Sequence, residues 1–468
     1  MHFSIPDTQE ITDGSGSTYT SFNIHINGVF HCTARFSLLH SFHEQLKKEF
    51  GATALPPFPP KKLFPIAGPK LDERRLMLER YIQIVSQEAA IANSDVFNSF
   101  LLTAQQETQK EQPENVSLDV YLMNGHKISV NIISTDQTED VLETVASQID
   151  LPDDFVYYFG LYLVRKEGDS ETSIVRKLQD FESPSISLKS ANLKGVHRIV
   201  LRKCFWDSSF DDELLANKVA MNLLYVQAVS DIDRQWVLAT KDQKEHLKSL
   251  QQKGSKREFL RLARTLKHYG YIQFHPCTAD YPQANSRVVI AAGNKELNFR
   301  ILVKPDAFKE AVFKITRIRC WRITTTVVDD SDNPDSSLLE LSFEYLIAKD
   351  TLQWITVQSE QAILMSMCLQ GMVEELIMKK QGRKIKKPSD RVRRGKKNFT
   401  RENSIPSGLV QSPSSEKDDR PHLPVTQKHV NKTVSKLQDL KLLKGKGTQN
   451  GDSVTNSAFE DAIGDDDL

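Results

Sequence analysis

Several features are scarce in this sequence of 468 residues, and each absence excludes a class of protein. Its five cysteines are scattered without a Cys-x-x-Cys pair, which favours buried thiols in a reducing compartment over a disulfide framework. No apolar run reaches the roughly eighteen residues of a membrane span, and the first residues lack a signal-peptide pattern. We therefore expect a cytoplasmic protein that can touch a membrane without crossing it.

Charge and catalytic motifs are equally uninformative at the level of the whole chain. Lys+Arg and Asp+Glu both number 61, so the net charge of zero gives no general attraction to nucleic acid. There is no His-Glu-x-x-His, no Walker phosphate loop, no Gly-x-Ser-x-Gly and no cluster of His and Cys. We expect no enzyme, no catalytic residue, no metal site and no cofactor, but a monomeric binding protein whose function lies in local clusters.

The hydrophobic periodicity divides the chain into several units, as its length requires. The expected fold class is multidomain α+β with a disordered tail, because Ser, Thr, Pro and Lys dominate the last part of the chain. The predicted units are a small α+β domain at residues 1–108, a hairpin, helix and further strands in the ubiquitin-like order at 115–206, a helical unit at 207–272, a β-rich unit closed by a long helix at 273–382, and a tail at 383–468.

The N-terminal unit gathers three cations around a proline-rich loop. Arg35 precedes a helical pattern for which Ser37 is the expected N-cap, Lys61 follows the prolines of "LPPFPPKK", and Arg74 begins the next helical pattern. Each of these residues alone is more often a solvated surface charge. Together, a guanidinium fork, a lysine on a stiff turn and the N–H groups of a helix start can bind phosphate.

This part of the sequence resembles the phox-homology (PX) domain, which binds phosphatidylinositol 3-phosphate. The resemblance rests on three stretches: "RFS", "LPPFPPKK" and "ERRLMLERY". The resemblance implies that Arg35 holds the 3-phosphate and that Phe36, in place of the family's tyrosine, stacks on the inositol beside Ser37. It further implies that Lys61 meets the 1-phosphate and that Arg74 bonds the 4- and 5-hydroxyls.

Two features near this cluster leave alternatives open. Lys62 and Arg75 stand beside the preferred cations, so the register of either position could differ by one residue. Leu63, Phe64 and Ile66 follow the lysines; they are either ordinary exposed apolar residues or, beside a lipid headgroup site, a wedge that enters the bilayer.

The β-rich unit offers a candidate site for an extended peptide, at the edge strand "IRCWRITTT" and the closing helix. A lone tryptophan in a strand is more often part of the core. The closing helix, however, is apolar on more than one face, so its surplus side chains could line a groove. The candidate peptide-binding residues are Arg319, Trp321, Arg322, Met372, Val373 and Ile377.

A ubiquitin-like unit, a helical unit and a β-rich unit closed by a helix follow the order of a FERM domain, whose third lobe resembles a phosphotyrosine-binding (PTB) or pleckstrin-like (PH) fold. A PX domain followed by an atypical FERM domain is similar to the PX-FERM subfamily of sorting nexins. This resemblance implies binding of Asn-Pro-x-Tyr or Asn-x-x-Tyr signals in receptor tails of the lipoprotein-receptor, integrin β and amyloid precursor types. It also implies a location on early endosomes and cytoplasmic vesicles, with recycling of receptors to the cell surface. The alternative is a FERM-type linker between membrane and cytoskeleton, or a signalling scaffold.

The acidic end of the chain and the segment before it are the last candidate sites. By composition the end is solubilising charge, whereas the resemblance implies that it docks the Retriever/Commander recycling complex. The residues concerned are Ile463, Gly464, Asp465, Asp466, Asp467 and Leu468. Asn456 and Phe459 reproduce the Asn-x-x-aromatic shape of a cargo signal, either by chance or because this segment binds the chain's own third lobe and is autoinhibitory.

Overall fold

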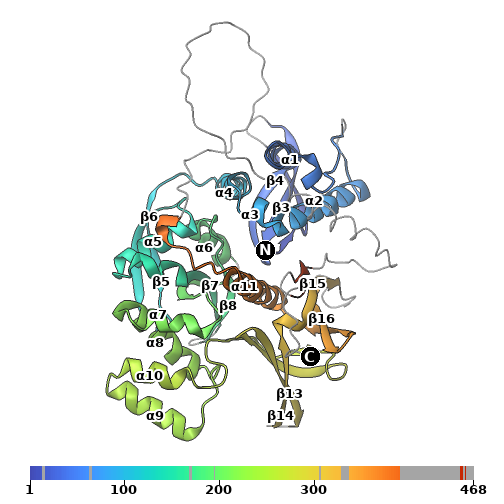
Figure 1. Ribbon diagram of the computed structural model, residues 1–468. Helices are drawn as coiled ribbons and strands as arrows, with labels where there is room; N and C mark the ends of the chain where they lie inside the picture. Colours follow the sequence, from blue (N-terminus) through green and yellow to red (C-terminus); the bar gives the residue numbers. More distant parts are fainter. Residues whose placement is uncertain are drawn as a thin grey trace.

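A computed structural model of the chain shows the arrangement of its domains (Figure 1). It describes residues 1–12, 16–62, 66–167, 171–193, 195–304, 307–327, 337–390, 454–456 and 459. Within these ranges, no helix has both the length and the apolar character that crossing a bilayer requires. The predicted multidomain α+β fold is confirmed, with an N-terminal PX-type domain followed by the lobes of a FERM domain.

The N-terminal domain packs helices against an antiparallel sheet. Its elements are β1 (Phe3–Ser4), β2 (Thr8–Thr12), β3 (Thr18–Ile26), β4 (Val29–Arg35), α1 (Phe36–Phe50), α2 (Pro69–Gln87), α3 (Ala89–Ala92) and α4 (Asp95–Gln109). The turn between β3 and β4 has positive φ at Asn27 (51°) and Gly28 (79°), the conformation that a two-residue hairpin turn requires. Burial of Phe22, Ile24 and Ile26 against the helices then fixes which face of β3 is inside.

The ubiquitin-like lobe is a mixed sheet with the strand order β6-β5-β9-β7-β8. Its elements are β5 (Asn115–Tyr121), β6 (Lys127–Ile133), α5 (Thr138–Gln148), β7 (Phe159–Glu167), β8 (Glu171–Lys177), α6 (Pro184–Asn192) and β9 (His197–Lys203). The strands β5 and β9 run parallel at the centre of the sheet, which requires the long crossover that the helices provide. One face packs on α5, and the other face contributes Tyr162, Val164 and Val200 to the core of the third lobe.

The helical lobe follows and is built from α7 (Asp211–Leu214), α8 (Lys218–Asp233), α9 (Lys241–Gln252) and α10 (Lys256–Ala263). Side chains cap its two longest helices. Asn217 accepts hydrogen bonds from the backbone N–H groups of Val219 and Ala220 at 2.9 and 3.0 Å, and Thr240 forms a reciprocal capping box with Gln243. The predicted helical unit is therefore confirmed, with its ends set by local side-chain contacts.

The third lobe is one antiparallel sheet closed by a long helix. The strands are β10 (Ile272–Gln273), β11 (Cys277–Ala279), β12 (Ser286–Gly293), β13 (Glu296–Lys304), β14 (Ala307–Lys314), β15 (Ile318–Val327), β16 (Ser337–Ala348), β17 (Thr351–Gln358) and β18 (Val454–Thr455), and the helix is α11 (Ala362–Lys380). The strand order is β14-β13-β12-β11-β17-β16-β15-β18, with β10 pairing with β12. The sheet thus ends at β15 on one side, except where the distant segment β18 is added to it.

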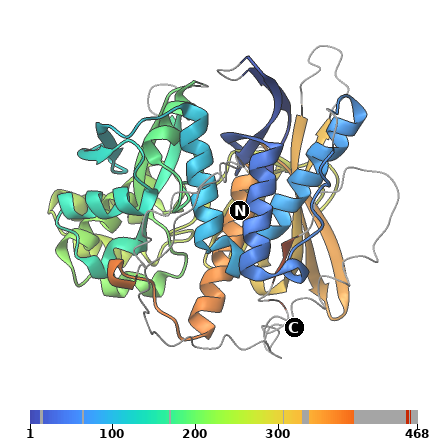
Figure 2. The same cartoon turned by 90° about the horizontal axis from the view of Figure 1, so that it is seen from above.

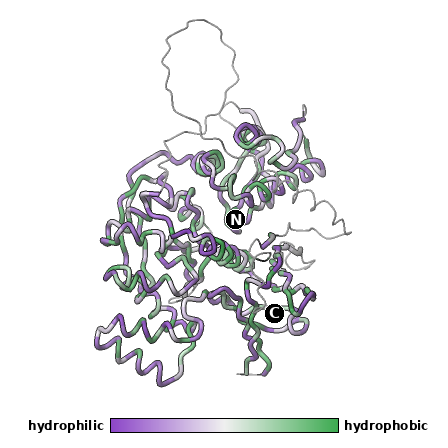
Figure 3. The backbone as a smooth tube through the Cα atoms, in the orientation of Figure 1, coloured by the Kyte–Doolittle hydropathy of each residue, from purple (hydrophilic) through white to green (hydrophobic). Residues whose placement is uncertain are grey.

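The helix α11 lies at the centre of the molecule and contacts every neighbouring domain (Figures 1 and 2). Figure 3 shows it as a largely apolar stretch at that position. The ammonium group of Met1 donates to Gln370 at 2.8 Å, and the Glu375 carboxylate accepts from the backbone N–H groups of Trp206 and Asp207 at 2.8 and 2.7 Å. The sheet covers one side of α11 and other domains cover its other sides. This packing accounts for the apolar residues on more than one face of the helix.

A short stretch of the region expected to be a disordered tail is described and lies against the ubiquitin-like lobe. Lys386 forms ion pairs with Glu139 at 2.5 Å and with Asp180 at 2.9 Å, and Lys387 contacts Asp154 at 2.6 Å. These ion pairs hold the chain beside this lobe, and the described part of the chain continues to Asp390, so the first eight residues of the predicted tail (383–390) are described. The sequence analysis assigned these residues to the disordered tail and did not foresee their acidic partners.

The PX domain and the ubiquitin-like lobe share a polar contact between α4 and α6. The Gln105 amide donates to Ser187 Oγ at 2.9 Å, and its oxygen accepts from the Ser183 N–H at 2.8 Å. Nearby, the His31 ring of β4 bonds the Leu101 carbonyl at 3.0 Å and meets the Phe181 ring edge-on at 5.9 Å. Buried polar groups that satisfy one another in this way fix the relative placement of two domains.

We expect His31 to make the stability of this contact depend on pH. Burial is the main cause that lowers the pKa of His31 to about 4, from the ordinary 6.5 that it has in the unfolded chain. Above pH 6.5 the ring is neutral in both states. Below pH 6.5 the His31 ring is protonated in the unfolded chain but stays neutral in the folded chain. The free energy of unfolding therefore falls as the pH drops from 6.5 towards 4, by about 2 kcal/mol at pH 5.

Thermal melting of the full chain between pH 7 and pH 5, compared with His31→Gln, measures this effect. The variant should lose part of the pH dependence, whatever its own melting temperature at pH 7. Two identical pH profiles would contradict the assignment.

Candidate functional site

The structure brings Arg74, Phe36 and the end of the proline-rich loop together in the PX domain. The guanidinium carbon of Arg74 lies 4.1 Å from the centroid of the Phe36 ring, and its Nη2 donates to the Pro60 carbonyl at 3.0 Å. Lys61 follows Pro60 directly and is exposed. The start of α1, the start of α2 and the loop therefore meet at one place, with the Arg74 guanidinium over the Phe36 ring.

Arg35 stands at the junction of β4 and α1, directly before Phe36 in the chain. Its backbone is extended (φ −77°, ψ 157°), it occupies the N-cap position of α1, and its guanidinium carbon lies 5.5 Å from the centroid of the Tyr19 ring. The expectation that Ser37 caps this helix is wrong: α1 begins at Phe36, Ser37 is exposed inside the first turn, and no side chain caps the helix. The N–H groups of the first turn thus have no side-chain acceptor, an arrangement that suits an anion.

The two neighbouring arginines of α2 make different contacts. Arg75 Nη1 donates to the Ile5 carbonyl at 2.5 Å, and its Nε lies 3.7 Å from Asp72. Arg75 is therefore held by the N-terminal segment, while Arg74 lies over the Phe36 ring. Lys62 is exposed beside Lys61, so the structure does not distinguish these two lysines.

An aromatic group that the sequence analysis missed supports the loop. The Phe58 ring lies 5.8 Å from Phe36, stacks on His43 with centroids 4.6 Å apart and meets the edge of Tyr81 at 4.9 Å. His43 Nδ1 is 2.8 Å from the Tyr81 hydroxyl, and burial is the main cause that lowers the pKa of His43. A neutral imidazole can stack on Phe58, so the loop rests on a preformed apolar platform.

The expected membrane wedge is only partly described. Leu63 and Phe64 lie outside the described residues, and Ile66 is half-buried. On α2, however, Leu76 is 44% exposed and Met77 is 37% exposed, within three residues of Arg74. These two apolar side chains were not singled out from the sequence, because they look like ordinary positions in a helical pattern.

In the third lobe, a segment from far along the chain is added to the edge of the sheet. The strand β18 pairs antiparallel with β15, with Cys320 opposite Thr455 and Trp321 opposite Val454. The next residue, Asn456, continues the ladder, because its N–H donates to the Arg319 carbonyl at 2.9 Å. Strand addition at an open sheet edge is a general way of binding an extended peptide.

Asn456 is the anchor of this segment and is 1% exposed. Its side-chain Nδ2 donates to the carbonyl oxygens of Ile315 and Ile318 at 2.9 and 2.6 Å. The Phe459 N–H then donates back to the Asn456 carbonyl at 3.1 Å, which forms a turn. An Asn-x-x-aromatic segment that extends as a strand before its asparagine and turns after it therefore occupies the β15 edge.

The side chains expected to line an open groove have a different place. Trp321 is 1% exposed, and its indole N–H donates to Ser366 of α11 at 3.0 Å, so the tryptophan is part of the core. Met372 and Val373 are also buried, at 1% and 5% exposure, and Ile377 is half-buried. Met372 and Val373 belong to the same core cluster as Trp321, and Val454 of the added strand packs against that cluster while its backbone pairs with β15.

The two arginines of the edge strand are engaged within the lobe itself. Arg319 forms an ion pair with Glu344, and the Arg322 guanidinium carbon lies 4.6 Å from the centroid of the Trp354 ring. Arg319 thus contacts the neighbouring strand β16, and Arg322 reaches across β16 to β17. The last candidate residues, Ile463, Gly464, Asp465, Asp466, Asp467 and Leu468, lie outside the described residues. Among the described residues, no group of three or more His, Cys, Asp or Glu is placed to hold a metal ion.

The cation cluster and the occupied sheet edge define a class of protein: a peripheral adaptor that joins a phosphoinositide-binding module to a receptor-tail-binding module. Comparison with protein-family models supports this class. A PX domain matches residues 22–104, the F1 lobe of the sorting nexin 17/27/31 FERM domain matches 116–206, the F2 lobe of the sorting nexin 17/31 FERM domain matches 207–267, and the sorting nexin 17 FERM C-terminal domain matches 270–377. These are lipid-binding and adaptor modules rather than enzymatic ones.

The similarity to whole proteins is closer still. The chain is 48% identical to sorting nexin-17 of Danio rerio and 48% identical to sorting nexin-17 of Homo sapiens, in both cases over 100% of each chain. It is 38% identical to human sorting nexin-31 over 81% of this chain and 86% of that protein. The chain belongs to the sorting nexin-17 family of PX-FERM proteins.

Proposed function

We propose that this chain is an endosomal cargo adaptor that reads phosphatidylinositol 3-phosphate and Asn-Pro-x-Tyr or Asn-x-x-Tyr signals at the same membrane. It retrieves receptors from early endosomes to the cell surface, and its acidic end, Ile463 to Leu468, hands them to the Retriever/Commander complex. The single observation that carries the proposal is the Asn456 segment on β15, because it occupies a sheet edge in the manner required of a cargo signal.

The lipid assignment rests on the cluster at the start of α1. Arg35 supplies a guanidinium beside the uncapped first turn, which together suit the 3-phosphate. Phe36 would stack on the inositol beside the Arg74 guanidinium that lies over its ring, and Lys61 is exposed at the loop for a second phosphate. Arg74, already bonded to Pro60, is preorganised to donate to ring hydroxyls. The wedge formed by Leu63, Phe64 and Ile66, extended by Leu76 and Met77, would then enter the bilayer.

The peptide assignment rests on the hydrogen bonds of Asn456. An asparagine side chain that donates to two backbone carbonyls is selected by geometry, since aspartate or leucine could not make these bonds. A cargo asparagine in the same position would make the same contacts. The tail segment containing Asn456 and Phe459 therefore acts as a tethered competitor, and the chain is autoinhibited until cargo displaces it.

The alternative role as a membrane–cytoskeleton linker predicts a different lipid. We expect the full chain to bind vesicles that carry phosphatidylinositol 3-phosphate, but not vesicles that carry phosphatidylinositol 4,5-bisphosphate. Binding to the 3-phosphate vesicles should become tighter when a lipid-anchored Asn-Pro-x-Tyr peptide is added. Vesicle flotation with each lipid, with and without the peptide, measures this preference.

The matched variants for this experiment are Arg35→Ala and Lys48→Ala, since Lys48 is an exposed lysine in the last turn of the same helix. Arg35→Ala should reduce binding to the 3-phosphate vesicles by about a hundredfold, the effect of deleting a charge-assisted bidentate contact to a phosphate. Lys48→Ala should leave it unchanged. Preference of the unaltered chain for the bisphosphate would favour the linker role.

A further inference from the structure

A cavity of about 190 Å³ lies between the ubiquitin-like lobe and the end of α8, and neither the cation cluster of the PX domain nor the β15 edge uses it. Four cations line it: Lys166 of β7, Arg198 and Arg202 of β9, and Arg234 just after α8. The described residues that line the cavity include no acidic side chain. A concave surface with cations alone attracts anions more strongly than the same charges on a convex surface.

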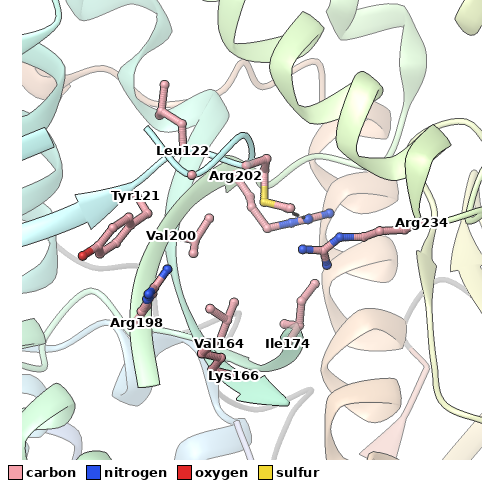
Figure 4. Close-up of a pocket in the computed structure, with 11 residues that line it drawn as sticks. Tyr121, Leu122, Val164, Lys166, Ile174, Arg198, Val200, Arg202 and Arg234 are labelled. Carbon is pink, nitrogen blue, oxygen red and sulfur yellow. Dashed lines mark hydrogen bonds between the residues drawn. The ribbon is translucent and has the colours of Figure 1, made fainter. Parts of the chain in front are cut away.

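The four cations form two groups, with an apolar floor between them (Figure 4). Arg198 and Lys166 lie on one side, Arg202 and Arg234 lie on the other, and Val164 and Val200 lie between. The Arg198 guanidinium carbon is 4.8 Å from the centroid of the Tyr121 ring, which limits its rotation. A ligand that satisfies both groups must therefore be negative at two places and apolar in the middle.

Arg202 supplies an independent sign that a ligand is expected. Its side chain is 2% exposed; its Nη1 donates to the thioether sulfur of Met123 at 3.2 Å and forms a buried ion pair with Asp231 Oδ1 at 3.7 Å. A thioether is a weak acceptor, and 3.7 Å is too long for a hydrogen bond. A buried guanidinium with such partners gains from an additional carboxylate, and it faces the cavity.

We propose that this cavity binds a short acidic segment of a partner protein, in which acidic residues flank an apolar one on both sides. A phosphate group fits less well, because it requires cations that converge on one point, whereas these are divided by Val164 and Val200. The site is separate from the phosphoinositide cluster, which lies in the PX domain, and from the β15 edge, which lies in the third lobe. It would let the adaptor hold a second protein while cargo is bound.

The test uses the full chain and a labelled peptide, Glu-Glu-Ser-Leu-Ser-Glu-Glu, measured by fluorescence polarisation. Reversing the two outer cations with Lys166→Glu and Arg198→Glu should weaken binding by about tenfold for each change, since each turns an attraction into a repulsion. The matched control is Lys244→Glu, an exposed lysine on α9 in the helical lobe. Affinity should also fall from low to high salt.

Further outcomes decide between this occupant and others. Replacing the peptide leucine by serine should weaken binding. Equal binding by the two peptides would contradict an acidic peptide as the ligand and favour a phosphate ligand. Preferential displacement of the peptide by inositol hexakisphosphate would lead to the same conclusion. A tenfold gain in peptide affinity on replacing Asp465, Asp466 and Asp467 by asparagine would overturn the partner assignment in favour of the chain's own acidic end. If the chain that carries both Lys166→Glu and Arg198→Glu binds the peptide as tightly as the unaltered chain, the peptide binds outside this cavity.

Discussion

Replacing Asn456 by alanine is expected to raise the affinity of the full chain for an Asn-Pro-x-Tyr peptide by about tenfold or more. The substitution removes two hydrogen bonds from the Asn456 amide to the carbonyls of Ile315 and Ile318, and it leaves both carbonyls without that donor. Each such bond contributes about 1 kcal/mol, so the tail would leave the β15 edge in a large share of molecules. Cargo peptide would then bind without first displacing a tethered ligand of about millimolar effective concentration.

Calorimetry of the full chain with the peptide measures this gain, and Asn450→Ala is the matched control, since it makes the same change a few residues earlier in the tail. The control should bind the peptide like the unaltered chain. Equal affinity of the Asn456→Ala chain and the unaltered chain would remove the basis for autoinhibition, although the docked geometry of β18 would still stand.

The same measurement with Trp321→Ala would be difficult to interpret, because the sequence did not determine whether Trp321 is a core residue or a peptide contact. From the sequence, Trp321 could be a core residue or a peptide contact, and the surplus apolar side chains of the closing helix favoured contact. Its indole is buried and bonded to Ser366, so truncation would remove a large core side chain at about 3–5 kcal/mol. A loss of peptide binding would then report unfolding of the lobe as readily as loss of a contact.

The closing helix was misjudged for a related reason. An amphipathic pattern tells how many faces of a helix are apolar, but it does not tell what covers each face. Met372 and Val373 looked surplus because only the sheet was counted as a neighbour. In the structure α11 is also covered by the PX domain and by the segment after β9, through Gln370 and Glu375.

Part of the proposed phosphoinositide cluster was easier to foresee, since its cations belong to short motifs whose spacing is visible along the chain. Arg74 and Phe36 do meet, and Arg75 is held elsewhere. The supporting residues Tyr19 and Phe58 were not foreseen, because their contacts come from packing between distant segments. The N-cap was placed at Ser37 by propensity, but β4 runs directly into α1, so the extended Arg35 already occupies the cap position.

Arg176→Ala is expected to lower the free energy of unfolding of the ubiquitin-like lobe by about 3–5 kcal/mol. The guanidinium of Arg176 and the carboxylate of Glu182 form an ion pair at 3% and 1% side-chain exposure. Burial would raise the pKa of Glu182, but Arg176 holds it below its ordinary value, so the carboxylate is charged at neutral pH. Removing Arg176 leaves that charge buried, with only the Gln179 N–H (2.6 Å) and the Ser187 hydroxyl (2.5 Å) to satisfy it.

Chemical denaturation with a probe in this lobe measures the loss, with Lys127→Ala as the matched control. Lys127 pairs with Asp119 at 3.1 Å on the surface, where such pairs contribute less than about 1 kcal/mol. Adding Glu182→Gln to Arg176→Ala should recover part of the loss, because the buried charge is then gone. Ser187, which donates to Glu182, also accepts from Gln105 of the PX domain, so the single variant should accelerate amide exchange in α4 as well. A loss confined to the lobe, with α4 unchanged, would mean that this cluster stabilises the fold without holding the PX domain against it.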